Sequence, residues 1–211
     1  KQEGAGVVFD QANETFTARY NHETIALAFA ITEEAIEDNL YDRLAARYTR
    51  ALARSMANTK QVKAANVLNN AQNTAFTGGD GKTLINSAHP LATGGTFSNV
   101  LATAADLNET SLEQSLIDIQ AFVDERGLKI ASQGVKMIIP KELQFTAERL
   151  MKSPQRTATA DNDINAIASM GMIPQGYRVN NFLTDTDAYF LLTDVPNGLK
   201  MFVRSPIKTA M

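Results

Sequence analysis

The strongest constraint on the fold is an apolar residue at every fourth position between residues 36 and 56. Six residues share this spacing: Ile36, Leu40, Leu44, Tyr48, Leu52 and Met56. Because residues four apart lie on one face of an α-helix, the pattern predicts a long amphipathic helix with a buried stripe. Thr32 can cap its N-terminus, and Glu33 and Glu34 suit the positive end of the helix dipole. We therefore expect a helix that begins at Thr32, is strong to Met56 and continues to Asn70.

The segment before this helix has the composition of extended chain. Val7–Phe9 and Thr15–Tyr20 are rich in residues that favour strands, and they flank a turn-prone stretch at residues 11–14. This pattern predicts a β-hairpin that carries few large apolar side chains. Since an isolated hairpin is at best marginally stable, we expect another element or another subunit to hold it.

The rest of the sequence predicts a mixture of helices and strands. A long turn-rich connection is expected where Gly and Pro are frequent, over residues 78–95. Two helices are predicted at Ser111–Arg126, ended by Gly127, and at Glu142–Lys152. Strands are predicted at Val135–Ile139, Tyr177–Asn180, Ala188–Leu192 and Leu199–Val203. Helices and strands do not alternate regularly, so the predicted fold class is α+β.

The composition limits the classes of protein that this chain can belong to. Its 211 residues are 44% hydrophobic and 20% charged, which is typical of a folded globular protein. A net charge of −3 leaves no basic excess for tight, sequence-independent binding to nucleic acid. The absence of cysteine excludes disulfides and thiolate chemistry. The longest apolar run, Ile25–Ile31, is too short to span a bilayer, and no signal-peptide pattern is present, so a soluble, non-secreted protein is expected. Because the sequence begins at Lys1, we expect a processed or partial product.

One glycine-rich motif, residues 78–83 (GGDGKT), is similar to a phosphate-binding loop. The spacing argues against that function, because the motif requires a glycine five residues before Gly81 and Phe76 stands there. The flanking sequence also lacks the preceding strand and following helix of such loops. An exposed turn is the favoured interpretation.

Other candidate chemistry is sparse. His22 and His89 are the only histidines, too few for a multi-histidine metal site. A hydrolase site could be drawn from Ser87, His89 and Asp106, but no G-x-S-x-G signature accompanies it, and His89 is expected to organise the Pro90 loop.

Charged residues give no stronger candidate. Asp161 and Asp163 could bind a cation, yet they complete no known calcium loop, so solvated side chains are favoured. The arginines of the long helix follow a group of acidic residues, an arrangement that suits the helix dipole better than nucleic-acid binding. The sequence therefore predicts no catalytic, cofactor-binding or metal-binding residue, and no enzyme.

Three segments, which occur in a fixed order, resemble one known family. They are residues 31–70 (ITEEAIEDNLYDRLAARYTRALARSMANTKQVKAANVLNN), residues 78–127 (GGDGKTLINSAHPLATGGTFSNVLATAADLNETSLEQSLIDIQAFVDERG) and residues 194–206 (DVPNGLKMFVRSP). Together they resemble the major capsid proteins of tailed bacteriophages that have the Hong Kong ninety-seven fold. The three segments are spread over nearly the whole chain, and as a set they are more specific than any single motif.

The resemblance implies an organisation and a function. Residues 1–31 would form an extended hairpin loop, residues 32–107 a peripheral domain with a spine helix and connecting loop, residues 108–194 an axial domain, and residues 195–211 a strand that returns to the peripheral domain. The protein would be a structural subunit that assembles with itself, through pentamers and hexamers, into an icosahedral shell around double-stranded phage DNA.

The same resemblance implies partners and a location. Scaffold, portal or decoration proteins are possible partners, contact with the packaged DNA would be weak and without sequence specificity, and no membrane or cofactor is involved. The protein would lie in the virion, and in the host cytoplasm during assembly. An encapsulin-like nanocompartment shell is the alternative, and a serine hydrolase a remote one.

Overall fold

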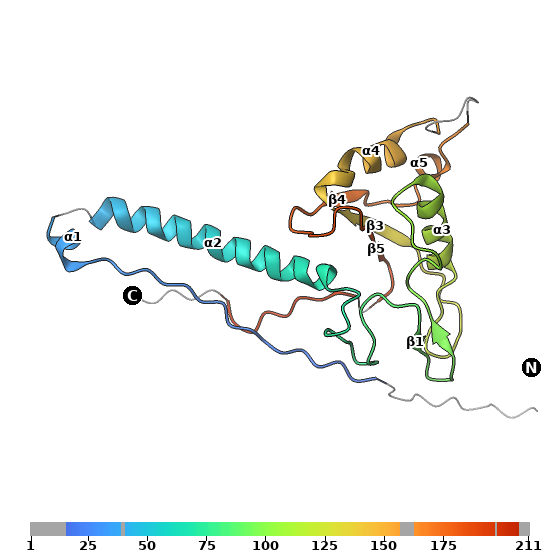
Figure 1. Ribbon diagram of the computed structural model, residues 1–211, viewed down its shortest axis with the longest axis horizontal. Coiled ribbons are helices and arrows are strands. Elements are labelled where there is room, and N and C mark those ends of the chain that lie inside the picture. Colours follow the sequence, from blue (N-terminus) through green and yellow to red (C-terminus); the bar gives the residue numbers. More distant parts are fainter. Residues whose placement is uncertain (1–15, 39–40, 157–162, 197, 207–211) are drawn as a thin grey trace, which may run out of the picture.

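The computed structural model describes residues 16–38, 41–156, 163–196 and 198–206, and for residues 41–44 only the backbone. The described chain has two parts, a body that contains a sheet and a long helix that projects from it (Figure 1). The body is a mixture of helices and strands, so the predicted α+β class is confirmed.

The body is built around β3 (Gly134–Ile139), the central strand of a three-stranded sheet. The strand β4 (Tyr177–Val179) pairs with it in parallel, and β5 (Phe190–Thr193) pairs antiparallel on the other side. Helices α3 (Glu109–Gln120), α4 (Gln144–Lys152) and α5 (Ala166–Met170) pack around this sheet, and a 3₁₀ turn (Lys141–Leu143) leads into α4. The strands predicted over residues 135–139, 177–180 and 188–192 are therefore confirmed within two residues.

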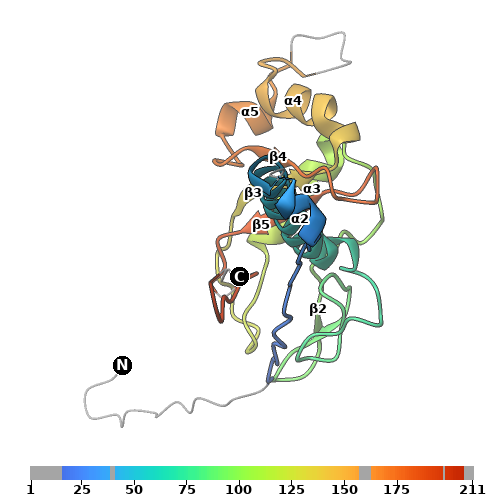
Figure 2. The same cartoon turned by 90° about the vertical axis from the view of Figure 1, so that its left-hand side faces the viewer.

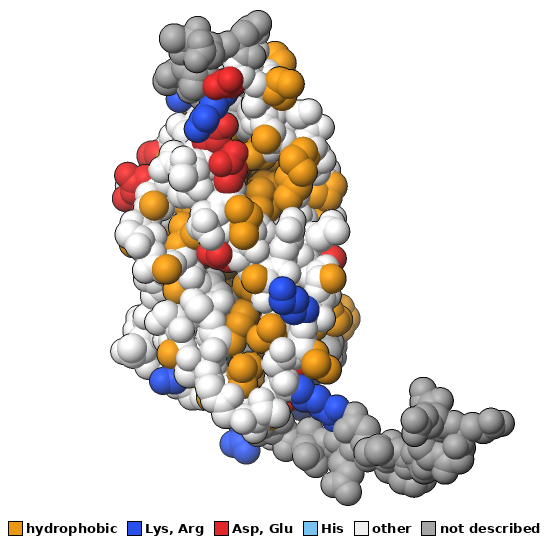
Figure 3. Space-filling view, turned by 90° about the vertical axis from the view of Figure 1, so that its right-hand side faces the viewer, with side chains coloured by type: hydrophobic (Ala, Val, Ile, Leu, Met, Phe, Trp, Pro, Cys, Tyr) orange, Lys and Arg blue, Asp and Glu red, His pale blue; other side chains and the backbone are white. Residues whose placement is uncertain are grey.

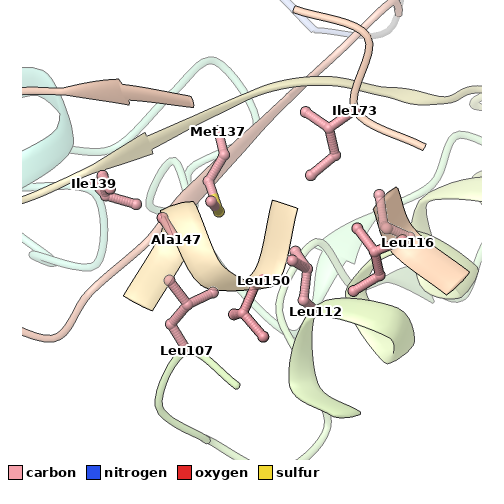
Figure 4. Close-up of a cluster of buried hydrophobic side chains, with 9 residues drawn as sticks. Leu107, Leu112, Leu116, Met137, Ile139, Ala147, Leu150 and Ile173 are labelled. Atoms are coloured by element: carbon pink, nitrogen blue, oxygen red, sulfur yellow. The ribbon is translucent and has the colours of Figure 1, made fainter. Parts of the chain in front are cut away.

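The hydrophobic core lies where β3 meets α3 and α4 (Figure 4). Met137 and Ile139 of β3 are fully buried, as is Leu112 of α3. Alternate residues of a strand point to the same face, so Met137 and Ile139 present one continuous apolar surface to the helices. Gly134 permits the close approach of α3, because a Cβ there would lie 2.8 Å from Leu116 Cδ2.

The helix α3 starts as expected but ends six residues early. Asn108 and Ser111 form a reciprocal capping box at its N-terminus. The predicted end at Arg126 is wrong, because Asp124 Oδ1 accepts hydrogen bonds from the amides of Arg126 and Leu128 and holds a turn instead. Gly127 belongs to this turn, with a φ of 81°.

The predicted long helix is present but interrupted, and its apolar stripe is not buried in the protomer. A short helix α1 (Glu33–Glu37) precedes α2 (Tyr41–Asn69), which runs without a break through the stretch where the prediction was weaker. Ile36 is 53% exposed and Tyr48 is 47% exposed. Leu52 and Met56 are half-buried, Leu40 lies outside the described residues, and only the backbone of Leu44 is described. The prediction that this stripe is core is therefore wrong at Ile36 and Tyr48.

The two terminal segments also differ from prediction. Residues 16–31 are extended but form no strand, so the strand predicted at residues 16–20 is wrong, and its proposed partner, Val7–Phe9, lies outside the described residues. The strand predicted at Leu199–Val203 is likewise absent. Both segments run beside α2 in Figure 1, and the rings of Tyr20 and Phe202 meet at 5.1 Å. They contact each other through side chains and not through a backbone ladder.

The connection between α2 and α3 contains only one small sheet. Strands β1 (His89–Pro90) and β2 (Thr96–Phe97) pair antiparallel, and the remainder consists of turns. This agrees with the predicted turn-rich connection.

Candidate assembly surface

His89 lies in this connection and pairs with an acidic side chain of the glycine-rich turn. Its Nδ1 lies 2.6 Å from Asp80 Oδ2, and both side chains are mostly buried. Its ring packs beside Phe97, which makes an edge-on contact with Phe122. Burial acts to raise the pKa of Asp80, but hydrogen bonds to His89 and to the amide of Lys82 outweigh it and lower the pKa. His89 therefore organises the loop, as the sequence predicted.

The glycine-rich motif forms a turn and not a phosphate-binding loop. Gly78 donates to the carbonyl of Lys82, and Gly81 adopts a φ of 73°. No helix follows the motif; two residues further on, the backbone of Ile85 bonds to Ala71. Gly79 has a packing role, because a Cβ there would lie 2.7 Å from the carbonyl oxygen of Thr17. The turn thus supports the extended N-terminal segment.

The residues of the hypothetical hydrolase site do not form a triad. His89 uses its Nδ1 for Asp80 and not for Asp106, and Ser87 is exposed with no hydrogen bond to His89. The carbonyl of Asp106 instead accepts from Ser111 at the start of α3. The other histidine, His22, is exposed in the extended segment.

No metal site is formed by the described part of the chain. Three or more His, Asp and Glu side chains nowhere converge there in a geometry that would hold a metal ion. Of the candidate cation pair, Asp163 is exposed and Asp161 lies outside the described residues.

A polar cluster on α4 was not anticipated from the sequence. Tyr177 donates to Glu148 Oε2 at 2.7 Å, and Lys152 donates to Glu148 Oε1 at 2.8 Å. The hydrogen bonds from Lys152 and Tyr177 lower the pKa of Glu148, although burial opposes them. The spacing of Glu148 and Lys152 is a recognisable helical pair, but only the fold brings Tyr177 to it. The three groups fasten β4 to α4 at the outer edge of the sheet.

The most distinctive surface is formed by α2 and the extended segment beside it. From residue 45 to residue 64 no side chain of α2 is buried. The extended segment is attached to α2 by the tilted ring contact of Phe29 with Tyr48 and by the ion pair of Glu23 with Lys63, whose N–O distance is 2.5 Å. Because most of the stability of a helix in a protein comes from packing of its amphipathic face, these few contacts leave much of α2 without support in the protomer.

Large hydrophobic side chains remain exposed over this surface and over the body. On the two terminal segments they are Phe16, Tyr20, Ile25, Leu27, Phe29, Leu199, Met201, Phe202 and Val203. Figure 3 shows further hydrophobic side chains spread over the face of the body that carries α3, with acidic groups mainly in its upper half and Lys or Arg side chains towards both ends. Contiguous apolar surface of this kind marks sites of protein–protein contact.

Comparison with protein families agrees with an assembly surface. A family model described as phage capsid protein matches residues 15–208, almost the whole chain. The chain belongs to the phage capsid protein family. No curated protein and no solved structure matched it.

The predicted resemblance to phage major capsid proteins is thus confirmed. The capsid protein is a structural component of the virion. Its family is a structural and not an enzymatic one. None of the helices in the described ranges is long and apolar enough to cross a membrane.

Proposed function

We propose that this capsid protein is the subunit of an icosahedral shell of the Hong Kong ninety-seven type, which encloses the double-stranded DNA of a tailed phage. The observation that carries the proposal is the family match over residues 15–208, together with a long helix that buries no side chain over twenty positions. Identical subunits that use two different surfaces for one contact close into rings, and rings of five and six close a shell. The match to a phage family favours a genome container over an encapsulin-like compartment.

In this proposal the body, from about residue 108 to residue 194, is the axial domain, and α2 is the spine helix of the peripheral domain. The buried residues of the core cluster fall within that range, with the exception of Leu107, which supports a separately packed body. The extended segment, residues 16–31, is the part that reaches a neighbouring subunit. The protein would have no enzymatic activity, and it would contact DNA weakly.

Electron microscopy of the full-length protein tests the proposal. Pentamers, hexamers or closed shells are expected, and a protein that stays monomeric over a wide range of concentration and salt would contradict it. A variant that lacks residues 1–30 is compared with the full-length protein. Because the core cluster contains none of these residues, the deletion should affect assembly and not folding. The deleted protein should keep its cooperative thermal transition and lose shell closure. A deletion that unfolds the body, or that still builds normal shells, would show that the extended segment has another role.

A further inference from the structure

The long helix carries an unusual separation of charge. Between residues 43 and 79 the sequence has six Lys or Arg and no Asp or Glu, although the whole chain has a net charge of −3. Three of these cations, Arg47, Arg50 and Arg54, follow one another at intervals of three and four residues. Such spacing places them on one face of α2, where they form an arginine stripe about 10 Å long.

The arginine stripe has no partner in the protomer. All three side chains are exposed, and none forms an ion pair with another described residue. Of the cations on α2 whose side chains are described, only Lys63 is paired, with Glu23 of the extended segment. The acidic residues before the stripe were expected to balance it along one helix, but the helix is interrupted after Glu37. The three glutamates therefore lie on α1, while Asp42 lies on α2.

The acidic group on α1 is equally unpaired. Glu33, Glu34, Glu37 and the following Asp38 are exposed and form no ion pair with another described residue. The three glutamates occupy about 100° of the circumference of α1, so they share one face. The acidic patch, defined as Glu33, Glu34, Glu37 and Asp38, extends about 8 Å along the chain and thus matches the arginine stripe in length as well as in charge.

We propose that the arginine stripe of one subunit binds the acidic patch of a neighbouring copy of the chain. This contact rests on the proposed function and specifies one interface of the shell. Arginine suits it because its planar guanidinium can pair with a carboxylate through two parallel hydrogen bonds. The two patches are different surfaces of the chain, so the contact is head-to-tail, the type that closes rings.

The structure favours a second copy over DNA as the occupant. The acidic patch lies at the same free end of α2 as the arginine stripe (Figures 1 and 2), and its carboxylates would repel phosphates. A neighbouring subunit, in contrast, satisfies both patches with one interaction. Figure 1 shows the same end of α2 projecting away from the body, so it is accessible to another subunit.

Charge exchange tests the proposal on the full-length protein. Reversal of the stripe (R47E, R50E and R54E together) and reversal of the patch (E33K, E34K and E37K together) should each raise the concentration needed for assembly about tenfold or more, since three ion pairs become repulsions. The protein that carries all six changes should recover assembly. Lys60→Glu is the matched control, because Lys60 is exposed on a different face of α2 and should leave assembly unchanged.

Light scattering and electron microscopy measure assembly, and circular dichroism verifies that each variant is folded. If a charge reversal disturbs folding, the neutral set R47Q, R50Q and R54Q replaces it and should make assembly less sensitive to salt than in the wild type. The proposal is overturned if folded six-change protein assembles no better than either reversal. It is also overturned if the arginine variants build normal shells and lose only binding to double-stranded DNA in a mobility-shift assay. Failure of the wild type to assemble would overturn the proposed function, and this contact with it.

Discussion

The structure places the stability of the protomer in the body, and a pair of substitutions on α3 tests this. Leu112 is fully buried in the core cluster, whereas Ile117, five residues later on the same helix, is 58% exposed. Leu112→Ala removes three carbon atoms, a transfer loss of about 2.4 kcal/mol at about 0.8 kcal/mol for each methylene. The cavity left among closely packed neighbours raises the expected cost to about 3–5 kcal/mol. Ile117→Ala should cost less than about 1 kcal/mol.

Thermal unfolding followed by circular dichroism measures this difference. For a chain of this size each kcal/mol corresponds to about 2–4 °C, so Leu112→Ala should lower the melting temperature by roughly 6–20 °C. The measurement requires the full-length chain at a concentration where light scattering detects no shells, since assembly would stabilise the folded state by mass action. Equal melting temperatures for the two variants, or a shift below about 2 °C for Leu112→Ala, would refute the assignment of the core.

Two further predictions concern the turn at residues 78–83. Gly79→Ala should displace the extended segment, because its Cβ would lie 2.7 Å from the Thr17 carbonyl oxygen. Limited proteolysis should cleave that segment faster than in Gly78→Ala, whose Cβ would approach no atom closer than a side-chain oxygen of Asp80 at 3.2 Å, and equal rates would contradict this. Asp80→Asn should make the melting temperature less dependent on pH in the acid range. The pKa of Asp80 is lowered in the folded state, so its contribution is present above about pH 3.9, the usual value when unfolded, and is lost as the pH falls through the folded pKa. Melting temperatures measured below about pH 4 should therefore fall more steeply for the wild type, and parallel curves would exclude a stabilising contact with His89.

Local signals in the sequence predicted the elements of the body well. The apolar residues around Lys136 identified β3, which buries Met137 and Ile139 on one face and half-buries Ile138 on the other. The end of α3 was missed because the deciding group is a single carboxylate, Asp124, whose turn competes with a continuing helix. The cluster of Glu148, Lys152 and Tyr177 was missed because it joins a helix to a strand far away in the sequence.

The candidate assembly surface was harder to predict, because the composition excludes several kinds of catalytic and metal site but does not indicate which residues form a contact surface. The sequence correctly reduced the glycine-rich motif to a turn, since Phe76 occupies the position of a required glycine. It could not indicate that Gly79 supports Thr17, because that contact depends on the path of the extended segment. The break between α1 and α2 was also hidden, as the four-residue spacing continues across it.

The exposed residues of the apolar stripe show a limit of predictions from helical periodicity. An amphipathic pattern requires a partner for one face, but it does not indicate whether that partner belongs to the same chain. Ile36 and Tyr48 follow the pattern and yet remain about half exposed, while the residues of α2 that the protomer buries, Ala65 and Leu68, lie at the end that meets the body. In the proposed shell this stripe would pack against a neighbouring subunit, so the sequence of the helix would reflect contacts between subunits as well as those of its own fold.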